Sequence, residues 1–119
     1  MRDEGGGVAV NPFANPTRIM VQARPQDMRA GIYRLATVVE AELGCRPDDG
    51  TLWCFVSRDR RKAKMIRYDG GAWCLWYVRL AEGSIRWERD ASGAPTLAID
   101  RSQLVCLLAG APVAERWAR

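Results

Sequence analysis

The stretch TLWCFVSRDRRKAKMIRYDGGAWCLWYVRL, residues 51–80, decides the fold of this chain. It contains three runs rich in apolar, aromatic and β-branched residues, which is the composition of β-strands: 51–57, 62–68 and 72–80. Short polar links separate the runs, and the Asp69-Gly70 pair in the second link is a strong hairpin signal. Consecutive hairpins predict an antiparallel meander. The last run is apolar on both faces, so we expect it at the centre of the sheet.

Short apolar segments on either side of this stretch extend the predicted sheet. The additional strands are TRIMVQ, SIRW and a short last strand TLAI: residues 17–22, 84–87 and 96–99. Pro25 ends the first of them, because proline cannot donate a hydrogen bond to a ladder. We therefore expect an antiparallel β-meander of about five strands.

Two helices are predicted outside the meander. Apolar residues recur at spacings of three and four along one segment, which places them on a single helical face: Met28, Ile32, Leu35, Val39 and Leu43. We expect this helix to run from Asp27, as N-cap or first-turn acid, to Leu43, with Gly44 as its stop. Residues 101–108 predict a short C-terminal helix with Asp100 as N-cap. The fold class is therefore α+β, with one amphipathic helix packed on the sheet.

The length of 119 residues suits one domain that can bury a core without metals or disulfides. We expect this domain to span residues 17–109, between a mobile N-terminal tail of residues 1–16 and a C-terminal tail of residues 110–119. No run is long and apolar enough to cross a bilayer. Residues 1–7 are acidic and glycine-rich, so we expect no secretory signal and, by default, a cytoplasmic location.

The composition offers little material for catalysis or metal binding. The chain has no histidine, the most common general base, and its four cysteines form no CxxC pair, so we expect no zinc, no other metal and no cofactor. The cysteines in apolar runs are expected to be buried free thiols, with a Cys54–Cys74 disulfide between neighbouring strands as the alternative. No P-loop or GxGxxG pattern occurs. We therefore expect no catalytic residues and no enzyme activity, the alternative being a small enzyme that uses Asp27 or Asp69.

Positive charge is concentrated in the meander. The net charge of the whole chain is +4. Residues 53–89 contain nine arginines or lysines against four acids, a balance of +5, and the remainder contains nine against ten, a balance of −1. A local excess of this kind is what an anion-binding surface requires.

The basic residues gather around the link between the first two strands of the meander. Arginine dominates there, and its planar fork matches the geometry of phosphate. The alternative is a solvated turn whose charges protect a sheet edge from aggregation. If the hairpin binds DNA, the contacts to phosphates are expected from seven residues: Arg58, Arg60, Arg61, Lys62, Lys64, Arg67 and Arg79.

The aromatic residues of the meander allow two interpretations: Trp53, Trp73, Trp76, Tyr77 and Trp87. They can form the bulky sheet face on which an amphipathic helix packs, which is the simpler interpretation. If they are exposed on one face, they can instead stack on single-stranded bases.

Three motifs occur in a fixed order along the chain. Residues 27–31 read Asp-Met-Arg-x-Gly, a basic turn leads to Lys64 and to Tyr-Asp-Gly at 68–70, and Arg-Leu at 79–80 precedes a glycine and a tryptophan. Over residues 17–108 this series resembles the small accessory protein of the IS66 family of bacterial insertion sequences. That protein is often called TnpB or the Orf2-like protein and is unrelated to the RNA-guided nuclease of the same name.

A few positions depart from the pattern of that family. Tyr68 stands where the family usually has tryptophan, Val78 where it often has lysine, and Glu88 where it has proline. The expected fold is unaffected by these changes.

The resemblance implies a role in transposition beside a separate transposase, which carries the catalytic carboxylates, and a second small accessory protein of the same element. It also implies DNA, at the ends of the insertion sequence, as the ligand. The first hypothesis is a non-enzymatic accessory protein that binds the DNA backbone through the basic hairpin. The second is a protein-interaction module that docks on the transposase without binding DNA, its hairpin meeting an acidic patch. Neither hypothesis involves a membrane or a small-molecule ligand.

Overall fold

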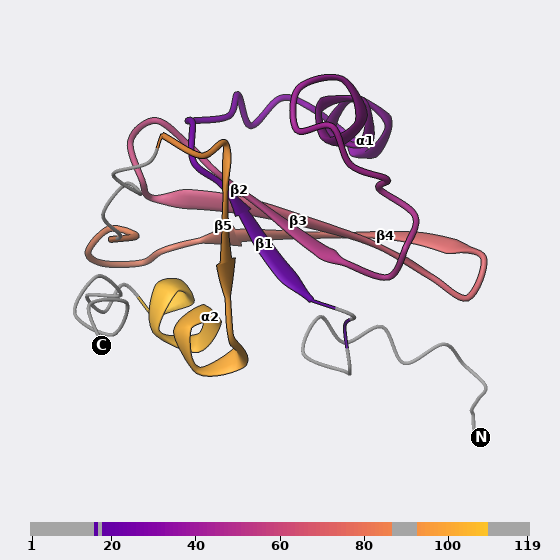
Figure 1. Cartoon of the computed structure of the whole chain (residues 1–119). Helices are drawn as coiled ribbons and strands as arrows, with labels where there is room; N and C mark the ends of the chain where they lie inside the picture. The colour runs from indigo at the N-terminus through magenta and orange to yellow at the C-terminus, as the bar shows by residue number, and fades with distance from the viewer. Residues whose placement is uncertain (1–15, 17, 87–92, 110–119) are drawn as a thin grey trace.

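The described residues form five strands and two helices, which confirms the predicted α+β class (Figure 1). The computed structural model describes residue 16 and residues 18–86 and 93–109. In chain order the elements are β1 (Ile19–Gln22), α1 (Ile32–Ala41), β2 (Leu52–Val56), β3 (Lys62–Asp69), β4 (Ala72–Arg79), β5 (Thr96–Ile99) and α2 (Arg101–Leu108). The two expected tails lie outside the described residues, apart from Pro16.

The strands form one mixed sheet in the order β4-β3-β2-β1-β5. Strands β2, β3 and β4 form an antiparallel meander, so the expected meander of about five strands is wrong beyond these three. Strand β1 pairs in parallel with β2, because α1 connects them and returns the chain to the end of the sheet at which β1 began. Strand β5 pairs antiparallel with the other side of β1. The sheet is therefore a meander extended by one crossover unit and one antiparallel strand.

Strand β2 lies at the centre of this sheet, and all five of its residues are buried. The prediction that residues 72–80 form the central strand is wrong, because β4 lies at the edge. Its apolar composition has another cause. Trp73 and Leu75 pack into the core under α1, whereas Trp76 and Val78 pack into the core on the opposite face. An edge strand that contacts a core on both faces has the same composition as a central strand.

Two apolar cores lie on opposite faces of the sheet, which we call the α1 face and the α2 face after the helix on each (Figure 1). Alternate apolar residues of β1, β2, β3 and β4 belong to different cores, as the two-residue period of a strand requires. On the α1 face the buried residues are Leu35, Ala36, Val38, Val39, Trp53, Phe55 and Ile66. On the α2 face the largest fully buried residues are Leu52, Met65, Ile85, Leu104 and Leu107.

Helix α1 begins at Ile32 with Gly31 as its N-cap, so the expected start at Asp27 is wrong. Asp27 instead closes a turn before the helix. Its carboxylate accepts a hydrogen bond from the Arg29 amide at 2.9 Å, and its carbonyl accepts one from the Ala30 amide at 3.3 Å. The short aspartate side chain bonds the nearby backbone and so competes with helix formation.

The C-terminal end of α1 is closer to the prediction. Gly44 has a φ of 67°, the left-handed conformation that glycine favours after a helix. The Leu43 amide donates to the Val38 carbonyl at 3.1 Å, and the Cys45 amide donates to the Val39 carbonyl at 3.0 Å. Leu43 lies beyond the helix, but its side chain packs on the α1-face core as its apolar spacing predicts.

Helix α2 has the predicted bounds and the predicted cap. The Asp100 carboxylate accepts a hydrogen bond from the Gln103 amide at 2.7 Å, and the Gln103 side chain accepts one from the Asp100 amide at 2.8 Å. This reciprocal pair is a capping box, which satisfies two of the free amides at the start of a helix. Strand β5, directly before it, also has the predicted bounds.

The expected strand at residues 84–87 is wrong for its described part. Residues 84–86 contain an isolated bridge at Arg86 and no strand, and residue 87 lies outside the described residues. The Ile85 amide donates to the Arg60 carbonyl at 2.6 Å. This segment is therefore bonded to the link between β2 and β3 instead of continuing the meander.

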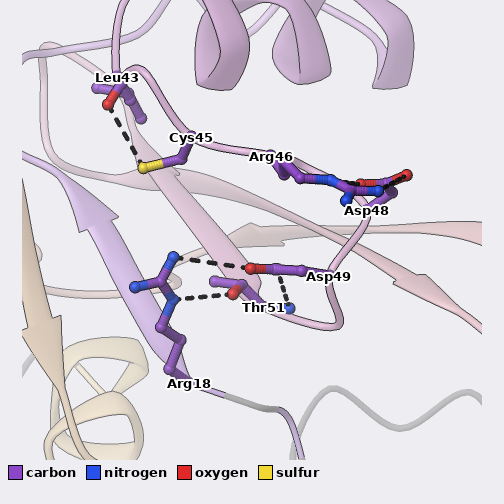
Figure 2. A network of polar contacts seen from close by, with 7 residues as sticks. All are labelled: Arg18, Leu43, Cys45, Arg46, Asp48, Asp49 and Thr51. Carbon is purple, nitrogen blue, oxygen red and sulfur yellow. Dashed lines mark hydrogen bonds and ion pairs between the residues drawn. The ribbon is translucent and has the colours of Figure 1, made fainter.

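A polar network joins the starts of β1 and β2 (Figure 2). Arg18 Nε donates to Thr51 Oγ1 at 3.1 Å, and Arg18 Nη2 lies 3.7 Å from Asp49 Oδ2. Asp49 also accepts a hydrogen bond from the Thr51 amide at 3.0 Å. The Leu52 amide donates to the Arg18 carbonyl at 2.9 Å. These contacts hold together the two chain segments that enter the parallel pair.

All four cysteines are free thiols. Cys54 in β2 and Cys74 in β4 are buried and separated by β3, so the alternative of a disulfide between neighbouring strands is wrong. Burial raises the pKa of the Cys54 thiol to about 12. Such a thiol stays protonated at neutral pH, which makes it a packing residue and not a nucleophile.

Candidate nucleic-acid interface

The link between β2 and β3, residues 57–62, is an ordered turn that we call the basic turn. The Ser57 amide donates to the Lys62 carbonyl at 2.9 Å, and the Lys62 amide donates to the Ser57 hydroxyl at 3.1 Å. The Arg60 amide donates to the Ser57 carbonyl at 3.0 Å. Arg60 has a φ of 60°, a left-handed conformation that residues other than glycine rarely adopt. The backbone of the basic turn is thus fixed by its own hydrogen bonds.

Asp59 holds the basic turn together. One carboxylate oxygen accepts hydrogen bonds from the Ser57 hydroxyl at 2.5 Å and the Arg61 amide at 3.0 Å. The other oxygen lies 3.4 Å from the Lys62 ammonium. These hydrogen bonds lower the pKa of Asp59 from its ordinary value of 3.8 to about 2, and the bond from the Ser57 hydroxyl has the largest effect. The one acid of the turn is therefore charged at neutral pH and occupied by contacts within the turn.

The basic turn is also attached to the chain that follows β4. The Leu80 amide donates to the Arg61 carbonyl at 2.8 Å, and the Ile85 amide donates to the Arg60 carbonyl at 2.6 Å. Two carbonyls of the turn are thus bonded to the body of the protein. The turn forms part of a continuous surface.

Five of the seven predicted contact residues lie together at this end of the sheet, and we call them the basic surface: Arg58, Arg60, Arg61, Lys62 and Arg79. The first four belong to the basic turn. Arg79 joins them because it is the register partner of Lys62 at the end of the β3–β4 ladder. All four arginines are exposed, and the Lys62 side chain is 29% exposed.

Lys64 and Arg67, the other two predicted residues, lie apart from the basic surface. The Lys64 ammonium donates to the Ala30 carbonyl at 2.8 Å and lies 5.5 Å from the centroid of the Tyr77 ring. Arg67 is only 8% exposed, and its Nη2 lies 4.0 Å from Asp69 Oδ2. The two are three positions apart along β3, so they lie on opposite faces of the sheet. Both charges are engaged within the fold, and we leave these residues out of the proposed interface.

An open cleft of about 750 Å³ lies beside the basic turn. The loop of residues 25–29 forms one wall, and Ser57, Arg58 and Lys62 line the other. Tyr77 of β4 also lines the cleft. The cleft therefore combines an aromatic ring with side chains that donate hydrogen bonds.

The loop wall of the cleft is held in place by two sets of contacts. The Gln26 amide donates to the Val56 carbonyl at 2.8 Å, which attaches the loop to the end of β2. The Arg29 guanidinium donates to both oxygens of the Asp27 carboxylate, with a shortest distance of 2.6 Å. The Arg29 guanidinium also lowers the pKa of Asp27, from 3.8 to about 2. This acid is therefore charged and paired at neutral pH.

The aromatic residues of the meander divide between core and surface. Trp53 is fully buried on the α1 face, and Trp73 and Trp76 are half-buried on opposite faces, as the helix-packing interpretation predicts. Tyr77 is 52% exposed. Trp87 lies outside the described residues. The stacking alternative therefore applies to Tyr77.

The sequence placed Tyr77 among five aromatic residues that could stack on bases if exposed, but it did not indicate Arg29 as a residue of a site. Arg29 reaches the cleft only because the loop before α1 folds against the end of β2, and no local sequence signal indicates this contact. For Tyr77 a partial signal exists, because alternation along β4 sets it on a different face from Trp76.

Neither a metal site nor a membrane-spanning helix occurs in the part of the chain that the structure describes. No three of its cysteine or acidic side chains are grouped so that they could hold a metal ion. Both of its helices are too short to cross a bilayer.

Comparison with known proteins gives the following matches. A family model described as "IS66 Orf2 like protein" matches residues 17–117, a range that covers every element named above. The chain is also similar to an uncharacterized protein, y4hO, of Sinorhizobium fredii. The two are 35% identical over 99 residues, which cover 83% of this chain and 84% of that protein. No solved structure matches the chain.

Proposed function

The chain belongs to the IS66 Orf2-like family, and from this membership we propose that it is a non-enzymatic accessory protein of DNA transposition that binds the phosphate backbone of DNA through the basic surface. Family membership supports the role in transposition. The geometry of the basic surface supports the choice of DNA backbone as the ligand.

The observation that carries this proposal is a set of exposed arginines on an ordered backbone. Arg58, Arg61 and Arg79 are exposed, and none of the three forms an ion pair with another described residue. The hydrogen bonds of the basic turn already fix the main chain under two of them. Binding then has to order side chains only, which lowers its entropic cost.

Arginine suits this task because its guanidinium offers parallel donors to two phosphate oxygens. Contacts of this kind fix the position of a protein on DNA and do not read base sequence. We therefore propose that the protein holds the DNA of the insertion-sequence ends, while recognition and catalysis belong to other components. The proposed partners are the transposase and a second small accessory protein of the same element.

The proposal predicts how affinity depends on salt. Binding of wild type to a duplex from the end of the element should weaken as salt increases, with a logarithmic slope of about −0.9 per phosphate contacted. The double variant Arg61→Gln/Arg79→Gln removes two contacts, so its slope should be shallower by about 1.8. The control Arg46→Gln/Arg101→Gln makes the same change in net charge at exposed residues near the opposite end of the sheet, and its slope should equal that of wild type. Fluorescence anisotropy across a salt series measures all three.

Two outcomes contradict the proposal. The first is a wild type that binds neither duplex nor single-stranded DNA at low salt. The second is a double variant that keeps its slope and its DNA affinity but no longer captures the transposase. The basic surface would then be a docking site for an acidic patch of that protein.

A further inference from the structure

The exposed ring of Tyr77 has no packing role comparable to that of the indoles near it. It is the register partner of Lys64 in the β3–β4 ladder and lies on the α1 face, beyond the part of that face that α1 covers. With 52% of its surface exposed, it is the most exposed aromatic residue of the described part of the sheet. The Lys64 ammonium lies 5.5 Å from the centroid of the ring. An exposed aromatic ring close to basic side chains is typical of surfaces on which nucleic-acid bases stack.

The chemistry of the cleft fits a nucleotide. Pro25, Met28 and Tyr77 supply apolar surface, and Arg58 and Lys62 supply donors of hydrogen bonds. The carboxylates of Asp27 and Asp59 also line the cleft. Pockets for small ligands have this mixture, and their volumes span roughly 300–1,000 Å³. The volume of this cleft, about 750 Å³, lies within that range.

The charges in the cleft point to one phosphate position. Lys62 is paired with Asp59 at 3.4 Å, and Arg29 is paired with Asp27 at 2.6 Å. Arg58 is exposed and forms no ion pair with a described residue. Its guanidinium is therefore the cleft-lining cation that a phosphate can bind without displacing an acid.

The walls of the cleft are ordered without a ligand. Lys64 connects the loop before α1 to the ring of Tyr77, since its ammonium contacts both the Ala30 carbonyl and the ring. The hydrogen bonds of Asp59 order the opposite wall. A binding site ordered in this way loses little conformational entropy when the ligand arrives.

From these observations we propose that the cleft binds one unpaired nucleotide of single-stranded DNA, with its base against the Tyr77 ring and its phosphate at Arg58. This inference rests on the proposed function and specifies the form of DNA that the protein prefers. A duplex exposes base edges in its grooves but keeps base faces stacked, so only an unpaired base can lie against the ring. The cleft would then bind an unpaired nucleotide at a strand end or in a melted segment, next to the phosphates that the basic surface binds.

The test compares Tyr77→Thr, Tyr77→Phe and the control Tyr33→Thr. The probes are a labelled oligothymidine strand, the same strand with abasic sites throughout, and oligothymidine paired with oligoadenine. Tyr33 is an exposed tyrosine of α1 that does not line the cleft, so it controls for loss of a surface ring. Threonine suits the exposed edge-strand position of residue 77, and thermal unfolding verifies that each variant is folded.

Tyr77→Thr should weaken binding of oligothymidine about 5- to 150-fold, the range expected for loss of one stacked base. It should leave binding of the abasic strand and of the duplex unchanged, because neither offers a free base face. Tyr77→Phe keeps the ring and should bind as wild type does, and so should Tyr33→Thr. The variant Arg58→Gln provides a second measurement, since loss of one phosphate contact should reduce the salt slope on the single strand by about 0.7.

Failure of this inference is distinguishable from failure of the proposed function. Suppose that wild type binds both forms of DNA with the predicted salt dependence, but Tyr77→Thr shows no loss of affinity that is specific to oligothymidine. The cleft then does not bind bases, and the proposal that the basic surface binds phosphates still holds. If no DNA binds at all, both proposals are overturned. If Tyr77→Thr loses transposase capture and no DNA affinity, the cleft is a site for a peptide.

Discussion

At the scale of single residues, Asp59 gives a run of basic residues a defined shape. Consecutive cations repel one another, and without an internal acceptor the turn would expose its amides to water. The Asp59 carboxylate accepts from the Ser57 hydroxyl and the Arg61 amide and pairs with the Lys62 ammonium. The Asp59 carboxylate therefore reduces the net positive charge of the basic turn by one, but it also orders the backbone that carries the arginines.

Replacement of Asp59 by alanine should lower the unfolding temperature at neutral pH, because three donors lose their acceptor. The pKa of this carboxyl is lower in the folded protein, about 2, than its ordinary value of 3.8. Its stabilising effect is therefore fully present above about pH 4 and is lost as the pH falls toward 2. The difference in unfolding temperature between wild type and Asp59→Ala should shrink over that window. Thermal unfolding followed by circular dichroism measures it.

The companion variant Asp59→Asn separates charge from hydrogen bonding. Asparagine keeps one acceptor oxygen but carries no charge, so this variant should approach wild type toward the acid end of the window, where Asp59 itself becomes protonated. A difference between wild type and Asp59→Asn that stays constant from neutral pH to pH 2 would show that the charge has no stabilising role.

At the scale of elements, the start of α1 differs from the start of α2. Helix α2 has a full capping box, whereas the N-cap of α1 is Gly31, which has no side chain to accept a hydrogen bond. Gly31 has a φ of −93°, and a Cβ atom built there would have no neighbour within 4 Å. Neither the backbone conformation nor the space at this position requires glycine.

Gly31→Ser should therefore stabilise the protein, by about 0.5 kcal/mol, since serine caps helices better than glycine and restricts the unfolded chain. The matched variant Gly44→Ser should destabilise by about 1 kcal/mol, because Gly44 has a φ of 67° that serine adopts only with strain. Midpoints of urea unfolding, with an unchanged slope, measure both effects. Equal effects of the two variants would contradict the account of both helix ends.

The elements that the sequence predicted well are those defined by local signals. The Asp69-Gly70 turn and the residues that flank it predict the β3–β4 hairpin, and Asp100 predicts α2. Of two elements that it predicted poorly, one depends on a local bond within a turn and the other on a distant strand pairing. The start of α1 was misplaced because the Asp27 carboxylate bonds its own turn, and β4 was misplaced because β1 enters the sheet beside β2.

The candidate site follows the same division. The cluster of Arg58, Arg60, Arg61 and Lys62 is continuous in sequence, so composition alone was enough to find it. Arg67 is close to these residues in sequence, but its side chain is buried. Its position along β3 sets the face of the sheet on which it lies, and the composition of the run does not show this. The cleft with Tyr77 could not be predicted, because its loop wall comes from the segment before α1 and meets the turn only in the folded protein.

At the scale of the whole molecule, the C-terminal elements complete both the sheet and the core. Strand β5 covers the open edge of β1, and Leu104 and Leu107 of α2 are buried in the α2-face core. Removal of both elements would expose an unpaired strand edge next to apolar surface, which is a combination that promotes aggregation.

A chain that ends at residue 93 should therefore aggregate or fail to unfold cooperatively. A chain of residues 17–109 keeps all of the described elements and should stay monodisperse, with an unfolding temperature close to that of the full chain. Size-exclusion chromatography and thermal unfolding test both chains. The second chain also tests the predicted domain bounds, which a large loss of stability on removal of residues 110–119 would contradict.

The position of β1 between β2 and β5 has a consequence for synthesis on the ribosome. This strand is translated early, but the register partners of its residues on the β5 side, from Gln22 with Thr96 to Ile19 with Ile99, are translated late. A nascent chain can form the meander while one side of its first strand remains open. The sheet can close only after residues 96–99 have emerged from the ribosome, long after β1 itself.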